Sequence, residues 1–191
     1  MRFYTHLFSI FFFVLSGSCF ADASLPPHQS IAEYTAQKDV DVLLLLMQKR
    51  LSVMHEVSRI KWNLQLPIED RVREGQILND LCIQCQKYTL DQAFVRNFFQ
   101  AQMEAAKAIQ SSDFALWSSI SNVHHEAVLD LKLDIRPYLD GITKELIEAI
   151  ARIYPIVANG TLSQYLTNDT LSSRYVDQID ENIWKIALSC F

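Results

Sequence analysis

The chain has 191 residues, half of them hydrophobic, so it can bury a core and is about one domain by length. Only four glycines and five prolines occur in it, which argues against a many-stranded β fold and for long helices. The formal net charge is −5 and no basic tail or stripe is present, which excludes nucleic acid as an expected partner.

Residues 1–21 have the pattern of an export signal. Arg2 is the only formally charged residue among them, and an apolar run over residues 7–15 follows it. This run is too short to span a bilayer comfortably, and the small residues after it predict signal-peptide cleavage after Ala21. Residues 22–191 would then form the mature domain, periplasmic or secreted and without stable membrane insertion. An uncleaved membrane anchor is the alternative.

Cleavage would remove one cation and no anion, which moves the formal net charge from −5 to −6. An acidic enzyme that binds an anion cannot depend on its overall electrostatic field. The sequence must therefore supply a local cluster of cations if the ligand is anionic.

The cysteines are Cys19, Cys82, Cys85 and Cys190, of which three would remain after cleavage. A disulfide among them is compatible with an oxidising compartment. Cys82 and Cys85 form a CxxC motif, but neither the βαβ context of a redox motif nor the further ligands of a zinc site are visible. The pattern favours buried helix cysteines, or one of them paired with Cys190, and it leaves the connectivity open.

Every predicted element is a helix, so the predicted fold class is all-α. Pro26-Pro27 disfavours helix in a lead-in over residues 22–37. Apolar residues at helical spacing predict a first helix from about Asp39 to Leu64. Its core candidates are Val42, Leu45, Leu46, Val53, Val57 and Ile60.

A second helix is predicted from Asp70 to about Lys87, and a third from Gln92 to Gln110 with Thr89 or Asp91 as its N-cap. The core candidates on these two helices are Val72, Ile77, Leu78, Leu81, Ile83, Phe94, Val95, Phe98, Phe99 and Met103.

The second half of the chain is less specific. The span from Asp113 to Leu133 is compatible with one helix or two, and Pro137 suits the first turn of a helix that runs to about Tyr154. The last helix is predicted from Asp177 to Leu188. Two segments are predicted to be turns: Asn159-Gly160 and Asn168-Asp169-Thr170.

Two cations are predicted to share a helix face. Arg50 and Lys61 are eleven residues apart, close to three helical turns of about 3.6 residues each. Their face also carries apolar residues, which is unusual for solvated cations. Asp70, Arg73 and Glu74 lie at i, i+3 and i+4, again on one face.

Each of these residues has an ordinary interpretation by itself: a surface cation, a snorkelling lysine or, for Asp70, a helix N-cap. The set as a whole changes the interpretation. Gln110 lies at the end of the third predicted helix, four residues after Ala106, and Arg136 directly precedes Pro137.

These residues resemble the exported gamma subclass of the all-helical AroQ-type chorismate mutases. The resemblance covers residues 42–117 well and residues 134–154 more loosely. It is carried by Lys49-Arg50-Leu51, the stretch from Lys61 to Asp70, Arg73-Glu74, the stretch from Val95 to Met103, and Ala108-Ile109-Gln110.

The resemblance implies one domain with a long first helix packed by several others, and an enzyme that rearranges chorismate to prephenate without a cofactor or metal. It implies that Arg50 and Arg136 bind the substrate carboxylates and that Arg73 helps to hold the substrate. Lys61 and Gln110 would flank the ether oxygen, and Glu74, with Asp70, would accept from the ring hydroxyl. Relatives often have Ser or Thr where this chain has Ala106.

Chorismate is a dianion, and the rearrangement needs no nucleophile or obligatory proton transfer. The C–O bond breaks while negative charge builds on the ether oxygen, so preorganised cations and donors suit this reaction. In cytoplasmic relatives one substrate cation comes from a partner subunit, whereas Arg136 would supply it here from the same chain. A homodimer is also compatible with the sequence.

Two other functions are considered. One is a non-catalytic secreted binding or effector protein that retains the fold and has no need for cations facing the core. The other is a metal or redox protein built around Cys82, Cys85, His124 and His125, although adjacent histidines point to different sides of a helix.

Overall fold

The computed structural model describes residues 30–126, 128–166 and 179–191, with the side chain of Cys82 left outside the description. The predicted signal peptide, the predicted turn at 168–170 and the predicted start of the last helix at 177 lie outside these residues. The described residues are helical and contain no strand. Their elements are α1 (Ile31–Ser52), α2 (Met54–Asn63), α3 (Arg71–Lys87), α4 (Gln92–Ser118), the π-helical turn η1 (Leu131–Ile135), α5 (Arg136–Ala158), the 3₁₀ turn η2 (Leu162–Gln164) and α7 (Glu181–Ala187).

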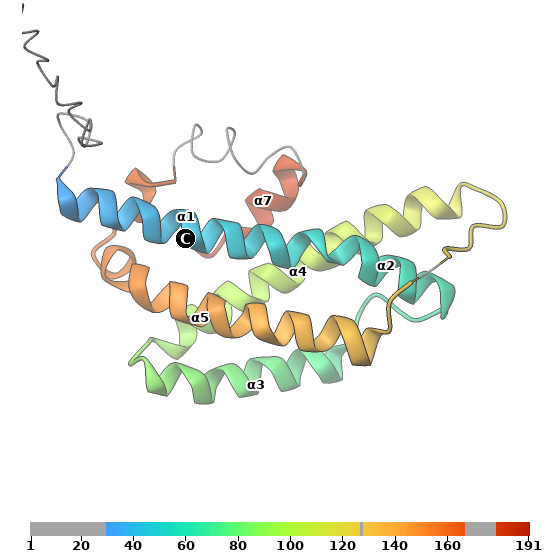
Figure 1. The fold of residues 1–191 in the computed structure, drawn as a ribbon, viewed down its shortest axis with the longest axis horizontal. Coiled ribbons are helices and arrows are strands. Elements are labelled where there is room, and N and C mark those ends of the chain that lie inside the picture. The colour runs from blue at the N-terminus through green and yellow to red at the C-terminus, as the bar shows by residue number, and fades with distance from the viewer. Residues whose placement is uncertain (1–29, 127, 167–178) are drawn as a thin grey trace, which may run out of the picture. The chain divides into compact units, whose positions relative to one another are not determined.

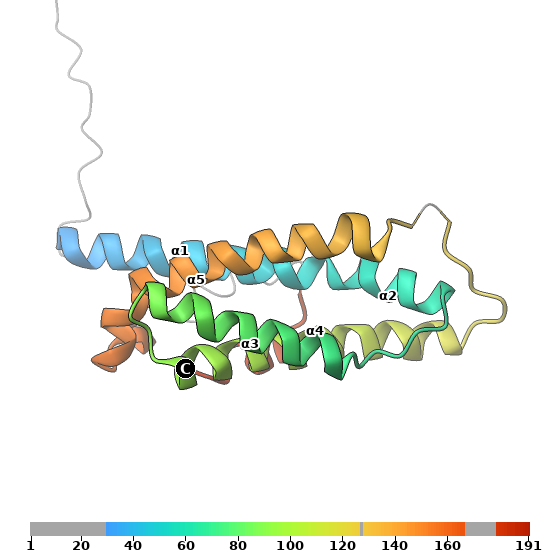
Figure 2. The ribbon, with the colours of Figure 1, turned by 90° about the horizontal axis from the view of Figure 1, so that it is seen from below.

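The helices from Ile31 to Phe191 form two layers. Helices α1 and α2 follow one another along nearly one line, with α5 beside them (Figure 1). Figure 2 shows α1, α2 and α5 as one layer and α3 and α4 as the other. Helix α5 packs along α1, while α4 contacts α2, α3 and α7.

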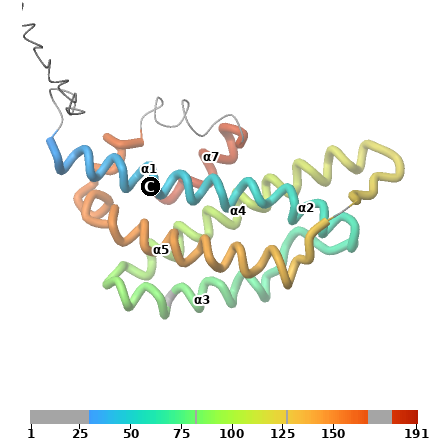
Figure 3. Tube along the Cα trace, viewed as in Figure 1, coloured from blue at the N-terminus to red at the C-terminus, as the bar shows by residue number. Residues whose placement is uncertain are grey.

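The predicted first helix is two helices. The regular helix is interrupted only at Val53, whose φ of −69° and ψ of −15° stay in the α-helical region. Helices α1 and α2 therefore follow one another along the trace (Figure 3). Helix α1 also begins at Ile31, earlier than the predicted Asp39, because the two prolines act only on the residues next to them. The interruption at Val53 does not separate Arg50 from Lys61, since both line the same pocket.

The apolar core lies where α1, α4 and α5 meet. Its fully buried members include Val40, Leu43, Leu44, Met47 and Leu51 on α1, Val95, Phe98 and Phe99 on α4, and Leu146, Ile147 and Ile150 on α5. Full burial of one such side chain stabilises the fold by about 1.5–3 kcal/mol. The layers therefore depend on these three helices.

Four residues that the sequence predicted to lie in the core are exposed, so these predictions are wrong. Val42 and Leu45 are 39% and 41% exposed, and Val72 and Ile83 are 73% and 70% exposed. On α1 the residues from Val42 to Met47 are all apolar, so the sequence does not show which face of the helix packs. The other predicted core residues are buried or pack against the core.

The caps of α3 and α4 explain where these helices begin. The Asp70 side chain accepts a hydrogen bond from Arg73 N at 3.0 Å, and that of Asp91 accepts one from Ala93 N at 2.8 Å. Such caps satisfy backbone N–H groups that have no partner within the helix. Asp91, not Thr89, is therefore the N-cap of α4.

Helix α4 is longer than predicted. It continues to Ser118, and the described residues 119–126 and 128–130 contain no regular helix. The prediction of one or two helices from Asp113 to Leu133 is therefore wrong beyond Ser118, up to the turn that begins at Leu131. The end of α4 is packed by aromatic residues: the rings of Phe114 and Trp117 lie 5.3 and 5.6 Å from that of Trp62 on α2. This tertiary packing outweighs the weak helix preference of the serines that follow Gln110.

The disulfide that the sequence suggested between Cys190 and one of the α3 cysteines is not present in the structure. Cys190 is partly buried and free, and burial raises its pKa to about 11. Cys85 is buried in α3. No described helix is both long and apolar enough to cross a membrane.

Candidate active site

All seven predicted site residues line one pocket, enclosed by α1 to α5 and by η1. These are Arg50, Lys61, Asp70, Arg73, Glu74, Gln110 and Arg136. The sequence analysis missed three polar lining residues, Lys107, Asp140 and Thr143. The remaining wall is mostly apolar and includes Met54, Val57, Ile77, Met103 and Leu139.

The charge of the lining is opposite to that of the chain. The pocket presents five cations, Arg50, Lys61, Arg73, Lys107 and Arg136, and three carboxylates, Asp70, Glu74 and Asp140, a formal net charge of +2. The whole chain carries −5. Apolar walls strengthen such a local field, because they exclude water that would screen it.

Arg50 is a buried cation with an unsatisfied donor. Its residue surface is 6% exposed, and its Nε has no hydrogen-bond partner. Burial lowers its pKa to about 10, and the charge of Asp140 offsets part of that effect. A buried charge without a close partner is costly to the folded state. This arginine is therefore placed to take an anionic ligand.

Lys61 is held at the pocket by the α2–α3 connection. Its Nζ donates to the backbone carbonyl of Ile68 at 2.6 Å. Burial lowers its pKa, the charges of Asp70 and Glu74 raise it, and the charge of Arg136 lowers it. An ammonium group has three donors, so this bond leaves others for a ligand.

Gln110 is buried on α4, with 4% of its surface exposed. Its Nε2 donates to Ala106 O at 3.1 Å and lies 3.9 Å from the Met54 sulfur, while its Oε1 is buried without a partner. The amide nitrogen carries two hydrogens, so one can stay on Ala106 while the other meets a ligand oxygen.

The first turn of α3 connects the carboxylates to the cations. Glu74 Oε1 accepts from Asp70 N at 3.4 Å, and Glu74 Oε2 lies 3.6 Å from Lys107 Nζ. Lys107 also pairs with Glu104 at 2.8 Å. The helix start and the α4 lysine together orient the Glu74 carboxylate.

Two cross-helix ion pairs join α3 and α5 at this pocket. Arg73 Nη2 lies 2.8 Å from Asp140 Oδ1, and Arg136 Nη2 lies 3.6 Å from Asp70 Oδ2. Both pairs are partly exposed. The two arginines that are far apart in sequence are therefore brought to one part of the pocket by paired carboxylates.

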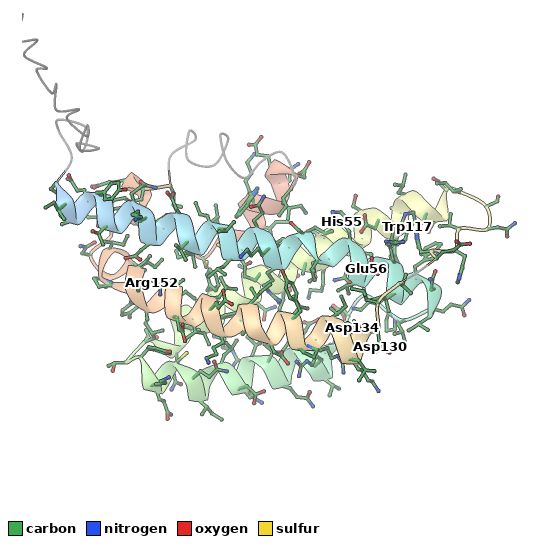
Figure 4. The ribbon with its side chains drawn as sticks, in the orientation of Figure 1. His55, Glu56, Trp117, Asp130, Asp134 and Arg152 are labelled. Carbon is green, nitrogen blue, oxygen red and sulfur yellow. The ribbon has the colours of Figure 1, made fainter. Side chains whose placement is uncertain are left out.

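The segment between α4 and α5 is fixed by the polar residues of α2. Asn63 Nδ2 donates to His125 O at 2.7 Å, and His125 N donates back to Asn63 Oδ1 at 3.0 Å. Leu129 N donates to Glu56 Oε1 at 3.1 Å. Figure 4 shows Glu56 and Trp117 at the end of the structure where this segment crosses.

The end of this segment brings Arg136 to the pocket. The Asp130 side chain accepts from Lys132 N and Leu133 N, both at 2.7 Å, and so caps the π-helical turn η1. Figure 4 places Asp130 at the start of this turn, next to α5. The first residue of α5, Arg136, follows the turn directly.

The alternative metal ligands lie apart from this pocket. Cys85 is buried on α3, and His124 and His125 lie in the segment after α4, not on a helix. Among the side chains that the structure describes, no three His, Cys, Asp or Glu groups are placed to hold a metal ion.

Comparison with known proteins gives the family. Residues 36–111 match the family described as "Chorismate mutase type II". The solved chorismate mutase from Burkholderia thailandensis has 31% sequence identity and a TM-score of 0.67, covering 81% of this chain and 98% of that one. The chain belongs to the type II chorismate mutase family.

Two secreted chorismate mutases are also similar. That of Yersinia pestis is 33% identical over 107 residues, which is 56% of this chain and 56% of the relative. That of Mycobacterium tuberculosis is 27% identical over 160 residues, 82% of this chain and 79% of the relative. The match thus spans only about half the length of the Yersinia protein.

The matched family segment contains six of the seven predicted site residues. Arg136 lies beyond residue 111, and it lines the pocket because the fold places the start of α5 there. Among the missed residues, Asp140 follows Arg136 by four positions, a spacing that places both on one helix face. That spacing could have indicated Asp140. Lys107 and Thr143 also lie at helical spacing from predicted site residues, three positions before Gln110 and seven after Arg136.

Proposed function

We propose that this chorismate mutase converts chorismate to prephenate in the pocket that contains Arg50. Family membership supports the proposal, and the observation that carries it is the buried Arg50 with its unpartnered Nε. The formal charge of +2 on the lining matches a dianionic substrate. A non-catalytic protein with this fold would have no reason to retain such a costly cation.

The arginines would bind the two carboxylates. A guanidinium keeps its charge at neutral pH and can bind a carboxylate through two parallel N–H donors. Arg50 lies on α1 and Arg136 on α5, so the pocket can hold the two carboxylates from different helices. Arg73 would add a third contact from α3. Holding both carboxylates favours the folded substrate conformer that can react.

Lys61 and Gln110 would stabilise the transition state. As the C–O bond breaks, electron density moves to the ether oxygen, and the Lys61 ammonium and the Gln110 amide would donate to it. Their fixed hydrogen bonds, to Ile68 O and Ala106 O, limit how far they must reorganise during the reaction. The pericyclic step moves no proton between substrate and protein.

Glu74, with Asp70, would accept the hydrogen bond of the ring hydroxyl. Glu74 is held by Asp70 N and lies near Lys107, so its carboxylate is fixed before substrate enters. The apolar residues Val57, Ile77 and Met103 would contact the ring. None of these roles calls for a metal or cofactor.

We also propose that the mature enzyme acts in the periplasm or outside the cell. The Yersinia and Mycobacterium relatives are named as secreted, and residues 1–21 have the export pattern described above. Mass spectrometry of the protein from the periplasmic fraction tests this proposal. The molecular mass should correspond to a chain that begins at Asp22. Full-length protein found only in the cytoplasm would contradict export.

The test of the activity is direct. Purified protein is mixed with chorismate after exhaustive dialysis against a chelator, and prephenate formation is followed by proton NMR. Enzymatic turnover well above the spontaneous rate is expected. A rate equal to the spontaneous one would refute the proposed function, and turnover that appears only after zinc is added would favour a metal protein.

A further inference from the structure

Asp140 is a carboxylate in the pocket that no assigned role uses. It lies on α5, one turn after Arg136, and its Oδ1 accepts a hydrogen bond from Arg73 Nη2 at 2.8 Å. Its charge also acts on Arg50, where it opposes the effect of burial. One carboxylate from α5 thus serves cations from both α3 and α1.

The geometry of the Arg73 pair leaves the guanidinium available to substrate. The Arg73 side chain is 28% exposed and that of Asp140 is 60% exposed, so the pair lies toward the open side of the pocket. An arginine has five N–H donors in a planar fork, and the hydrogen bond to Asp140 uses only the Nη2 nitrogen. Asp140 can therefore hold one edge of the fork while another edge faces the ligand.

We propose that Asp140 is a positioning residue for the rearrangement: its carboxylate holds the Arg73 guanidinium in the orientation that binds substrate. This inference rests on the proposed function and names a further residue of the same site. Asp140 acts before substrate arrives, because it restricts the rotation of the long Arg73 side chain. The entropy cost of ordering that side chain is then not incurred when substrate binds.

A competing physical effect has the opposite sign. A carboxylate near a dianion repels it and competes for the same guanidinium. If competition dominated, removal of the Asp140 charge would tighten substrate binding. The exposure of Asp140 favours positioning, because solvent screens its longer-range repulsion of substrate more than the direct 2.8 Å hydrogen bond to Arg73. The direction of the change in KM therefore decides between the two effects.

The kinetic experiment compares Asp140→Asn and Asp140→Ala with Glu145→Gln. Glu145 is an exposed carboxylate on the same helix and does not line the pocket, so its variant controls for loss of one negative charge. We expect Asp140→Asn to raise KM for chorismate about threefold to tenfold, with kcat within about twofold, as suits one exposed charged pair. Asp140→Ala should raise KM at least as much, and Glu145→Gln should leave it unchanged.

A second measurement does not depend on turnover. The Arg73 guanidinium signals are recorded by NMR and assigned with an Arg73→Lys variant. A guanidinium held at one nitrogen rotates slowly about its Nε–Cζ bond, so we expect separate Nη signals in the native protein and averaged signals in Asp140→Asn. Thermal unfolding of each variant shows whether it is folded.

The outcomes separate this inference from the proposed function. Failure of the native protein to convert chorismate would refute the proposed function, while the Arg73 signals would still show whether Asp140 holds the side chain. Turnover by the native protein with an unchanged or lower KM in Asp140→Asn would overturn the positioning role. Identical Arg73 signals in native and Asp140→Asn proteins would overturn it as well.

Discussion

The helices α1 and α4 each have an apolar part and a polar part. On α1, Leu43, Leu44 and Met47 are fully buried, yet one or two turns later the same helix buries Arg50. On α4, Phe98 and Phe99 are followed by the buried Gln110. The apolar part stabilises the fold, whereas the polar part leaves buried atoms of Arg50 and Gln110 without hydrogen-bond partners.

This difference between the two parts of each helix shows that the polar pocket lowers the stability of the folded protein. Buried polar atoms that lack hydrogen bonds destabilise a protein, and such strain is retained where function needs it. If this view is right, substitutions in the core should change stability and leave the chemistry intact. Substitutions in the pocket should do the reverse.

The largest effect is expected in the apolar core. Leu44→Ala should lower the free energy of unfolding by about 2–5 kcal/mol, because a fully buried leucine leaves a cavity. Chemical denaturation measures this loss, and the rate per folded molecule should stay near that of the parent. Leu45→Ala is the matched control: Leu45 is the next residue and is 41% exposed, so a much smaller loss is expected. Equal losses in the two variants would contradict the assigned core face of α1.

Removal of a pocket cation should have the next largest effect, on catalysis. Arg50→Ala and Lys61→Ala should each lower kcat/KM by about 100-fold or more, since loss of one preorganised donor costs ~3 kcal/mol in the transition state. Helical circular dichroism should stay near normal. The control is Arg152→Ala: this arginine lies far along α5 from Asp130 in Figure 4 and pairs with Asp39. Near-normal rates in both pocket variants would reject the assigned site.

A smaller effect, opposite in sign, is expected for Arg50→Met. The variant should be inactive and more stable than the parent by about 1–3 kcal/mol, because an apolar side chain of similar length removes a buried charge that Asp140 compensates only in part. Melting curves give the comparison. A large loss of stability would show that Arg50 has a structural role.

The gain from Arg50→Met should depend on pH. Burial lowers the pKa of Arg50 from its ordinary value to about 10, so the folded state disfavours the charged form. The parent therefore bears the full cost of the buried charge below about pH 10, and this cost falls as the pH rises from there toward the ordinary pKa of an arginine. The difference between variant and parent should narrow over that interval.

The smallest effect is expected for Gln110→Glu. This variant loses activity only while its glutamate is ionised, so lowering the pH should restore the activity. An ionised glutamate would repel the ether oxygen, whereas a protonated one can donate to it, so activity should be about tenfold lower at neutral pH and recover as the pH falls through the glutamate pKa. The kcat/KM profile measures this recovery. Gln92→Glu, at the exposed start of α4, is the control and should show no new ionisation. An unchanged profile in Gln110→Glu would show that Gln110 does not face the ether oxygen.

Local interactions could be predicted from the sequence because they act within a few residues. Asp70 and Asp91 cap α3 and α4 through backbone groups two or three positions away. Helical periodicity similarly indicated that Arg50 and Lys61 share a face. The resemblance joined these separate signals into one candidate site, and the seven residues it indicated do line one pocket.

Tertiary structure decided what periodicity could not. The exposed Val42 and Leu45 differ from their buried neighbours only in what packs against them, so an all-apolar stretch contains no signal for the buried face. The extension of α4 to Ser118 depends on aromatic contacts with α2.

The sequence by itself determined an all-helical chain, the starts of α3 and α4 and the residue types needed to bind a dianion, because each depends on short-range spacing and side-chain chemistry. The tertiary structure alone decided that Lys107 meets Glu74 from another helix and that Arg73 meets Asp140 across 67 positions of sequence. Such a contact depends on how α3 and α5 pack. Packing is set by the summed burial of many apolar side chains, which no local pattern in either helix records.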